Sequence, residues 1–386
     1  MNVSKTIPFA RPLIEAEEIS RIVKTLSSPV LVHGPMLEKF ENDFSSFTKS
    51  PFSIAVSSCT AALHLAYVYL NLRPGDEVLV PAETHVATAH AVEFCGAKPV
   101  FIDSELKTGN LDLDQIEDKI NKNTRALSLV HFLGMPVNME RVMQIAQKYD
   151  LFVVEDCALA IGSYFDNIHA GLHGDVGCFS FYPVKHFTTA EGGMLITRNK
   201  NMAQSIKRLR AFGLDRHVGE RKVDGMYDVP ILGYNYRLNE LQSSLGIEQL
   251  AKVPSFLEKR KKNYILLQQQ LRDVTEIDLL HSTEGRYQSS YYCLCVLLDG
   301  SLCSKRLELL HYLNEHGIGT SIYYPKPVPF MSYYRNKYSI PPTAFPMART
   351  ISERSICFPV GPHVDEESVH TIANTFKNAI SYVRRT

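Results

Sequence analysis

The chain has 386 residues, which is enough for two domains and a large core at about 150 residues per domain. Hydrophobic residues make up 45% of it and charged residues 21%, as in an ordinary soluble globular protein. Lysine plus arginine and aspartate plus glutamate number 41 each, so no net field favours DNA, RNA or an anionic membrane as a partner.

The N-terminal segment M-N-V-S-K-T-I-P-F-A-R-P lacks the apolar centre of a secretory signal. The most apolar stretch, residues 54–70, is too polar to span a bilayer because it is interrupted by Ser57, Ser58, Thr60 and His64. The 8 cysteines are scattered without a C-x-x-C pair, which favours reduced thiols over disulfides or a metal site. We therefore expect a cytoplasmic protein without a membrane span or a bound metal.

Short apolar runs rich in β-branched residues alternate with helical patterns from residue 51 onward. The predicted strands are 51–58, 76–81, 97–103, 125–132 and 151–156. The predicted helices between them are 60–70, 87–95, 111–120 and 138–149. Repeated strand–helix–strand units indicate an α/β fold with a large, mostly parallel sheet covered by helices on both faces. Ligands of such sheets bind at the carboxyl ends of the strands, where we expect Ser57–Thr60, Glu83–His85, His131, Glu155–Asp156 and Ser180–Lys185.

The pattern changes after about residue 250. A helix at 248–271 precedes a strand at 290–298, a loop rich in proline and tyrosine, and an amphipathic helix from Glu366 to Val383. We therefore predict a large domain at 1–250 and a smaller C-terminal α/β domain at 251–386. The extreme N-terminus is expected to pack on the small domain.

Lys185 stands in the aromatic and apolar run S-F-Y-P-V-K-H-F, where we expect it at the end of a buried strand. A buried amine must be compensated or neutral, and a neutral amine is the nucleophile that a Schiff base with a carbonyl requires. The alternative is a lysine that extends to solvent beyond an edge strand. Both interpretations stay open on this run alone.

Two further motifs carry chemistry. Asp156 ends the apolar run L-F-V-V-E-D, where a carboxylate caps the next helix, binds a cation or holds a protonated pyridine nitrogen. The turn S-S-C-T-A-A at 57–62 leads from a strand into a helix, and its backbone N–H groups form an anion site suited to a phosphate. Ser180 can add a hydroxyl to the same phosphate. Such turns also cap many helices that bind no ligand.

Five motifs in this order closely resemble one family. They are S-S-C-T-A-A-L-H-L-A, T-H-V-A-T-A-H-A-V, V-E-D-C-A-L-A-I-G-S, G-D-V-G-C-F-S-F-Y-P-V-K-H-F-T-T-A-E-G-G and L-G-Y-N-Y-R-L-N-E-L-Q. Together they resemble the pyridoxal-phosphate-dependent sugar aminotransferases of the DegT/DnrJ/EryC1/StrS family. The resemblance extends from R-P at 11–12 to C-F-P-V-G-P-H at 357–363 and implies fold type I, the aspartate-aminotransferase-like fold.

The resemblance implies a role for each site residue. Lys185 binds pyridoxal 5'-phosphate (PLP) covalently and moves protons, with pyridoxamine 5'-phosphate (PMP) formed during turnover. Asp156 pairs with the pyridine nitrogen, and His85 stacks on the cofactor ring; the alternative for His85 is a core histidine. The phosphate is bound by Cys59, Thr60 and Ser180.

Further residues of the same resemblance point to a partner subunit and to the substrate. Asn235 matches the residue that enters the neighbouring subunit's phosphate site, which implies a homodimer with shared active sites. A turn-forming asparagine is the alternative. Tyr323 and Tyr324 match the loop that approaches the substrate, although aromatic residues near prolines often only pack.

Two positions depart from the family pattern. Cys59 stands where the family usually has glycine, which is tolerable if its φ stays negative. Leu159 stands where the family has glutamine or histidine, whose side chain donates a hydrogen bond to the phenolic oxygen of the cofactor. Leucine cannot donate, so altered tuning of the cofactor is expected, not loss of its binding.

The implied activity is transfer of an amino group, from L-glutamate, to a nucleotide-linked keto-deoxysugar by aldimine and ketimine chemistry at Lys185. Three alternatives remain. The first is amination of a keto-cyclitol, and the second is a sugar dehydratase of the same fold, which has histidine in place of the lysine. The third is a non-catalytic PLP-binding regulator, which the leucine at 159 alone supports.

Overall fold

A seven-stranded sheet forms the centre of the computed structural model, which describes residues 6–215, 223, 226–280 and 284–385. Its order is β1-β9-β8-β5-β4-β2-β3. The strands are β1 (Phe52–Val56), β2 (Glu77–Pro81), β3 (Lys98–Ile102), β4 (Thr124–Val130), β5 (Phe152–Asp156), β8 (Val176–Ser180) and β9 (Gly193–Thr197). β9 runs antiparallel to both of its neighbours, and the other pairings are parallel. The expected mostly parallel sheet is confirmed.

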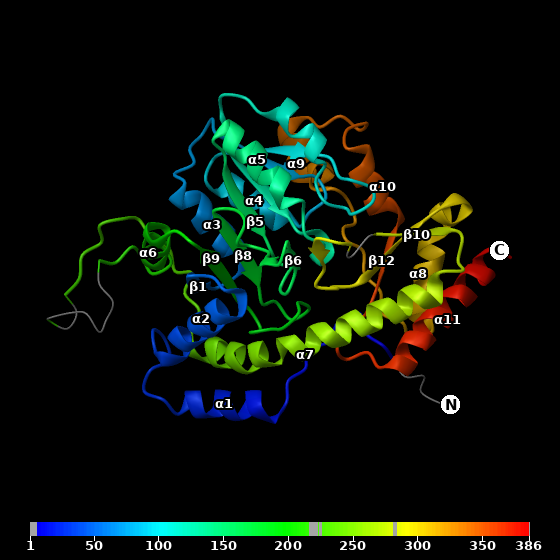
Figure 1. The fold of residues 1–386 in the computed structure, drawn as a ribbon, viewed down its shortest axis with the longest axis horizontal. Coiled ribbons are helices and arrows are strands. Elements are labelled where there is room, and N and C mark those ends of the chain that lie inside the picture. The colour runs from blue at the N-terminus through cyan, green and yellow to red at the C-terminus, as the bar shows by residue number, and fades with distance from the viewer. Residues whose placement is uncertain (1–5, 216–222, 224–225, 281–283, 386) are drawn as a thin grey trace.

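Helices cover both faces of this sheet because its strands are apolar on both sides (Figure 1). Val78 and Val80 of β2 join the core under one set of helices, whereas Leu79 joins the core on the opposite face. The first face carries α3 (Cys59–Tyr69), α4 (Val86–Phe94) and α6 (Lys200–Leu209). The second carries α2 (Pro35–Thr48), α5 (Met139–Tyr149) and the first half of α7 (Glu240–Leu271), against which α1 (Ala16–Leu26) packs.

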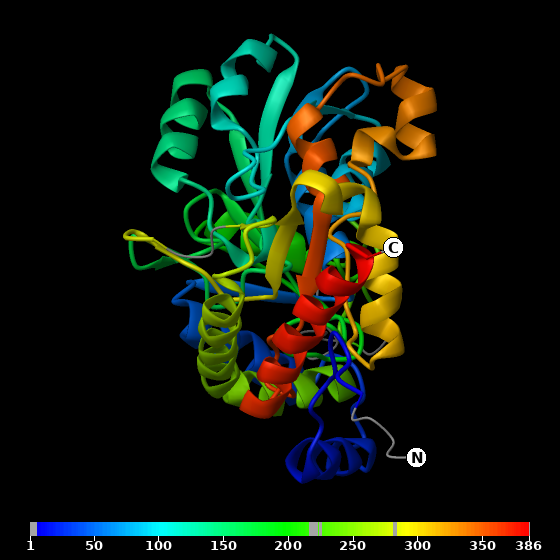
Figure 2. The same ribbon diagram turned by 90° about the vertical axis from the view of Figure 1, so that its right-hand side faces the viewer.

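A second, antiparallel sheet packs against the C-terminal half of α7 (Figure 2). It contains β10 (Ile277–Leu279), β12 (Leu294–Leu298) and β13 (Ser355–Phe358), with α8 (Arg306–Glu315) and α11 (Glu366–Val383) packed on it. Ile7 joins this core and pairs with Ile318. Because α7 runs unbroken past residue 250, the division into domains 1–250 and 251–386 stays a prediction.

The segment between β12 and β13 returns to the large sheet. It contains α9 (Ser332–Tyr338) and α10 (Pro346–Arg354), and Tyr334 of α9 is buried against Phe101 of β3. A small three-stranded sheet of β11 (Tyr287–Gln288), β6 (Tyr164–Phe165) and β7 (Ile168–His169) lies at the side. The C-terminal part of the chain therefore contacts the strand ends where ligands of such sheets bind.

Two predicted helices differ in the structure. Residues 111–120 form two short 3₁₀ turns, Leu113–Gln115 and Glu117–Lys119, because the Asp112 carboxylate accepts the backbone N–H of Asp114 and favours a local turn. The helix expected from residue 248 begins at Glu240, where Asn239 and Gln242 form a capping box.

Among the described residues, no helix combines the length and apolar character that crossing a membrane requires. All 8 cysteines are free thiols, as the sequence predicted.

A buried ion pair between α2 and the end of α6 provides a test of the packing under β1. Glu41 is 7% exposed and accepts hydrogen bonds from Arg210 and from the backbone N–H of Ala55 at 2.9 Å. Replacing Glu41 with alanine leaves the Arg210 guanidinium buried without its counter-ion, so the free energy of unfolding should fall by about 3–5 kcal/mol in urea titrations.

The matched control is Asp43→Ala on the same helix. Asp43 pairs with Lys39 at 2.9 Å on the exposed face, where such pairs contribute about 0.3–0.5 kcal/mol. Equal losses in the two variants would contradict the structural role of the buried pair.

Candidate active site

A cavity of about 340 Å³ opens at the carboxyl ends of β1, β5 and β8. Seven of the predicted site residues line it: Cys59, Thr60, His85, Asp156, Ser180, Lys185 and Tyr324. Leu159 also lines it. The structure thus brings together side chains that lie as far apart in the chain as residues 59 and 324.

Lys185 does not end a strand, so that prediction was wrong. β8 ends at Ser180, and Pro183 then turns the chain, so that the backbone N–H of Lys185 donates to the Tyr182 carbonyl at 2.9 Å. Its Nζ lies 5.8 Å from the ring centre of Tyr292. Burial lowers the pKa of the Lys185 amine, and the Asp156 carboxylate opposes this shift in part. The surroundings therefore favour the neutral, nucleophilic amine.

His186 points away from the cavity, although it follows Lys185 directly. It is 2% exposed, and its Nε2 hydrogen bonds the Ser290 carbonyl at 3.1 Å. Burial lowers the pKa of this imidazole well below its usual value. His186 is therefore a core histidine that cannot replace Lys185.

Asp156 is held by hydrogen bonds to both of its carboxylate oxygens. Oδ2 accepts from the Thr88 hydroxyl at 2.8 Å, and Oδ1 accepts from the backbone N–H of Ala158 at 3.0 Å. Asp156 therefore stabilises the following turn and also faces the cavity. Thr88 was not predicted from the sequence, but T-H-V-A-T places Thr84 just before α4 and Thr88 in its first turn, where their hydroxyls lie 2.8 Å apart.

The N-terminus of α3 faces the cavity with Cys59 and Thr60 in its first turn. Ser58 caps this helix, because its hydroxyl accepts the N–H of Ala61 at 3.0 Å. Gly193 of β9 lies so close that a β-carbon there would be 2.4 Å from the carbonyl carbon of Ser58. The cradle thus needs glycine at 193 and presents a helix N-terminus suited to an anion.

The β-carbon of Cys59 is accommodated because this residue has helical backbone angles. Its thiol lies 3.9 Å from Oδ1 of Asp156, towards which it can donate. Burial and the nearby carboxylate raise the pKa of the Cys59 thiol well above its usual value, so the thiol stays protonated. Cys59 therefore links the helix N-terminus to Asp156.

His85 caps α4, since its Nδ1 accepts the N–H of Ala87 at 3.2 Å. The centres of the His85 and Tyr324 rings lie 5.9 Å apart, and the angle between the two ring planes is 63°. Burial, and to a smaller extent Lys185, lower the pKa of the His85 imidazole, so the ring is neutral at neutral pH. The cap fixes its orientation at the cavity wall.

The two remaining predicted residues lie outside the lining of this cavity. The hydroxyl of Tyr323 hydrogen bonds that of Tyr292 at 2.7 Å, behind Tyr324. Asn235 is exposed, and its Oδ1 accepts from Nε of Arg237 at 2.9 Å. Any role of Asn235 therefore concerns molecules outside this chain's own cavity.

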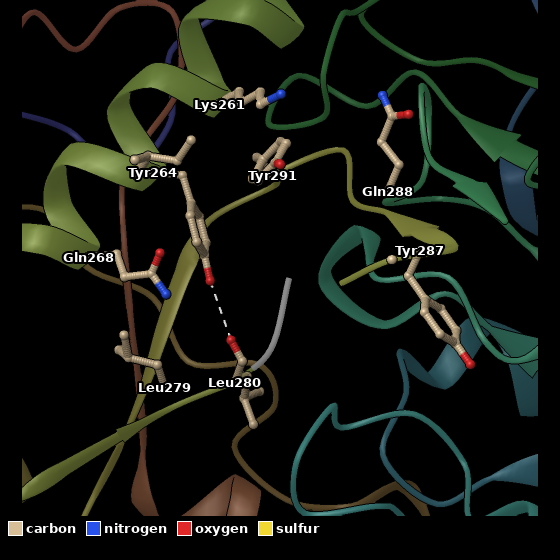
Figure 3. Close-up of a pocket in the computed structure, with 10 residues that line it drawn as sticks. Lys261, Tyr264, Gln268, Leu279, Leu280, Tyr287, Gln288 and Tyr291 are labelled. Atoms are coloured by element: carbon tan, nitrogen blue, oxygen red, sulfur yellow. Dashed lines mark hydrogen bonds between the residues drawn. The ribbon is translucent and has the colours of Figure 1, made fainter. Parts of the chain in front are cut away.

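A larger cavity, of about 440 Å³, lies between α7 and the strands β10 and β11 (Figure 3). The hydroxyl of Tyr264 donates to the Leu280 carbonyl at its wall, at 3.3 Å. None of the predicted site residues lines it, and its described lining holds no carboxylate. The smaller cavity is therefore the candidate active site, because there an amine, a buried carboxylate and a helix N-terminus converge.

These groups fit the cofactor that the sequence predicts. A neutral amine suits an aldehyde, a held carboxylate suits a protonated pyridine nitrogen, and a helix N-terminus without an obstructing β-carbon suits a phosphate. The neutral ring of His85 offers an aromatic face between them.

Comparison with known proteins supports the same conclusion. The model of the DegT/DnrJ/EryC1/StrS aminotransferase family matches residues 12–377. The uncharacterized protein MJ1066 of Methanocaldococcus jannaschii is 32% identical over 379 residues, which cover 97% of this chain and 98% of that protein. GDP-perosamine synthase of Escherichia coli O157:H7 is 30% identical over 379 residues, which cover 98% of this chain and 99% of that protein.

Among solved structures, Spr1654 from Streptococcus pneumoniae in its PMP form has a TM-score of 0.93 and 29% identity, with 98% of this chain and 100% of that chain covered. The same protein is known in a PLP form, with a TM-score of 0.92. These likenesses confirm the expected fold type I and the expected cofactor, PLP. The chain therefore belongs to the DegT/DnrJ/EryC1/StrS aminotransferase family.

Proposed function

We propose that this chain transfers an amino group from L-glutamate to a keto-deoxysugar carried on a nucleoside diphosphate. The observation that carries the proposal is the buried amine of Lys185, which shares one cavity with Asp156 and the N-terminus of α3. The name of the related GDP-perosamine synthase points to a nucleotide-linked sugar. The family assignment supports the aminotransferase chemistry.

PLP supplies, when bound, an aldehyde that takes up the amino group and a ring that accepts electrons. Lys185 holds the cofactor and then accepts the proton from the substrate carbon that carries nitrogen, returning it later. Asp156, oriented by Thr88, would keep a proton on the pyridine nitrogen. The first turn of α3 and the Ser180 hydroxyl would bind the phosphate, and His85 would cover one face of the ring.

The positions of Lys185 and His186 argue against the dehydratase alternative. A dehydratase of this fold has histidine at the place of the lysine, whereas here the lysine faces the cavity and the histidine is bound to Ser290. The direct test is a panel of nucleotide-linked keto-sugars and a keto-cyclitol, each incubated with glutamate and followed by product mass. Amination of the cyclitol alone would replace the proposed substrate class.

We also propose a homodimer with shared active sites. Asn235 is exposed and lies outside its own chain's cavity, as a residue that serves a neighbouring subunit must. Several exposed apolar side chains occur on the stretch of chain before it: Phe212, Met226, Tyr227, Val229 and Leu232. Exposed apolar side chains in such number are typical of a surface that another protein covers.

Replacing Lys185 with alanine should reduce turnover by about 10³-fold or more, since a positioned general base alone contributes about 10²–10⁴-fold. Borohydride treatment of the PLP-loaded wild type, followed by peptide mass mapping, should place the cofactor on Lys185. The control is Lys261→Ala in the larger cavity, which should leave turnover near the wild-type value. Cofactor found on another lysine would overturn the assignment.

Because position 159 is a leucine, the absorbance of bound PLP should change at a different pH in the wild type than in a variant with a hydrogen-bond donor at this position. The Leu159 side chain is 2% exposed in the cavity and cannot donate to the phenolic oxygen. A hydrogen bond to a charged group contributes about 1.5–3 kcal/mol, so Leu159→Gln should lower that titration by about one pH unit or more. Leu159→Met is the control without a donor. Identical absorbance titrations in the glutamine variant and the wild type would refute the idea.

Mixing inactive subunits tests the shared site. Hybrids of Lys185→Ala and Asn235→Ala chains contain one site in which both residues are intact, so part of the activity should return on mixing. Subunit exchange is verified by native mass spectrometry of differently tagged chains. Demonstrated exchange without any recovery would show that Asn235 does not act in the partner's site.

A further inference from the structure

Glu83 is a buried carboxyl group next to the candidate active site, but it does not line the cavity. It follows β2 and is 0% exposed. Its Oε1 accepts the backbone N–H of Tyr324 at 2.7 Å, and its Oε2 hydrogen bonds the Ser352 hydroxyl at 2.8 Å. The neighbouring carbonyl of Ala82 accepts the N–H of Val328 at 2.9 Å. The end of β2 therefore holds the loop from 324 to 328 at two points.

The segment that begins at Glu83 and leads into α4 also lines the cavity, through Thr84, His85 and Ala87. His85 contacts the ring of Tyr324, and Thr88 holds Asp156. Glu83 thus joins this segment to the loop that brings Tyr324 to the cavity wall. Displacing this carboxyl group would free the part of the cavity wall that Tyr324 forms.

Ser352, the second partner of Glu83, is itself held in place. It is 1% exposed on α10, whose N-terminus is capped by Asp103. The Asp103 carboxylate accepts the N–H groups of Met347 at 3.1 Å and Ala348 at 2.8 Å. α10 therefore presents the Ser352 hydroxyl to Glu83 from a fixed position.

The surroundings favour the neutral form of this carboxyl group. Burial raises the pKa of Glu83 to about 8, with a smaller contribution from Asp103, while the hydrogen bonds from Tyr324 and Ser352 oppose the shift. The Cys295 thiol and the Tyr324 phenol, whose pKa values a charged Glu83 would raise further, have raised pKa values and stay neutral. A neutral carboxyl group still accepts hydrogen bonds, so it keeps its contacts with the N–H of Tyr324 and with the Ser352 hydroxyl.

We propose that Glu83 is a positioning residue that holds Tyr324 at the wall of the cavity and thereby sets the fit of the acceptor substrate. The role in substrate fit rests on the proposed function, whereas the role in holding Tyr324 does not. Glu83 touches neither the cavity nor Lys185, so it acts through the loop alone.

Hydrogen–deuterium exchange tests the hold on Tyr324 without any substrate. In PLP-loaded Glu83→Met, the peptide that contains Tyr324 should exchange about tenfold faster or more, because its amide loses a buried acceptor. In Glu83→Gln this peptide should exchange within about twofold of the wild-type rate, since the side-chain amide of glutamine offers the same acceptor and donor as a neutral carboxyl group. Peptides from β5 and α11 should not change in either variant and serve as internal controls.

Kinetics test the second half of the proposal. KM for the keto-sugar should rise about fivefold or more in Glu83→Met and return towards the wild-type value in Glu83→Gln, while kcat changes less than KM. Unchanged exchange at Tyr324 in Glu83→Met would overturn the proposal, whatever the substrate proves to be. Faster exchange with an unchanged KM would overturn the role in substrate fit alone.

If Glu83→Met does not fold, exchange at Tyr324 can be measured in Ser352→Ala instead. This variant frees Oε2 and keeps the carboxyl group, so exchange at Tyr324 should rise, though less than in Glu83→Met. Exchange equal to the wild type in Ser352→Ala would then count against the arrangement.

Discussion

The structure of the site depends on one buried carboxylate, Asp156, which needs hydrogen-bond donors around it. Asp156 is 4% exposed at the end of β5, where an unpartnered charge would be strongly unfavourable. The Thr88 hydroxyl, the N–H of Ala158 and the Cys59 thiol lie around it and come from three different strand ends. Satisfying Asp156 therefore aligns α3 and α4 with β5, and this alignment shapes the cavity in which Lys185 lies.

Other buried carboxylates show the same physical solution away from the cavity. Glu240 accepts three backbone N–H groups at the start of α2, and Glu155 accepts three from residues 171–174 besides its contact with His131. Hydrogen bonds to the charged form offset the loss of hydration, and they lower the pKa of Glu155 although its burial is complete. Among the described residues, Glu83 has two hydrogen-bond partners, one of them a neutral hydroxyl, and burial outweighs them and raises its pKa.

The repeated strand and helix pattern predicted the large sheet well, since period-two and helical spacing are local properties that burial on both faces preserves. The prediction failed at 111–120, where Asp112 stabilises a turn with a bond that helical periodicity does not reveal. It also failed at Lys185, because the apolar run resembles a strand but the ladder of β8 ends at Ser180, and Pro183 then turns the chain before Lys185. Thr88 was missed because its partner lies 68 residues away.

The sequence by itself determined the family, the fold class, the cofactor and the group of residues at the strand ends, because these follow from local patterns and from the order of motifs. Only the tertiary structure decided which of the two predicted tyrosines faces the cavity: Tyr324 does, whereas Tyr323 hydrogen bonds Tyr292. It alone also placed Glu83 against Tyr324 and Ser352 from the C-terminal part of the chain. The physical reason is that the two hydrogen bonds of Glu83 join it to residues that lie 241 and 269 positions away in the chain. A separation along the chain does not say where two side chains meet.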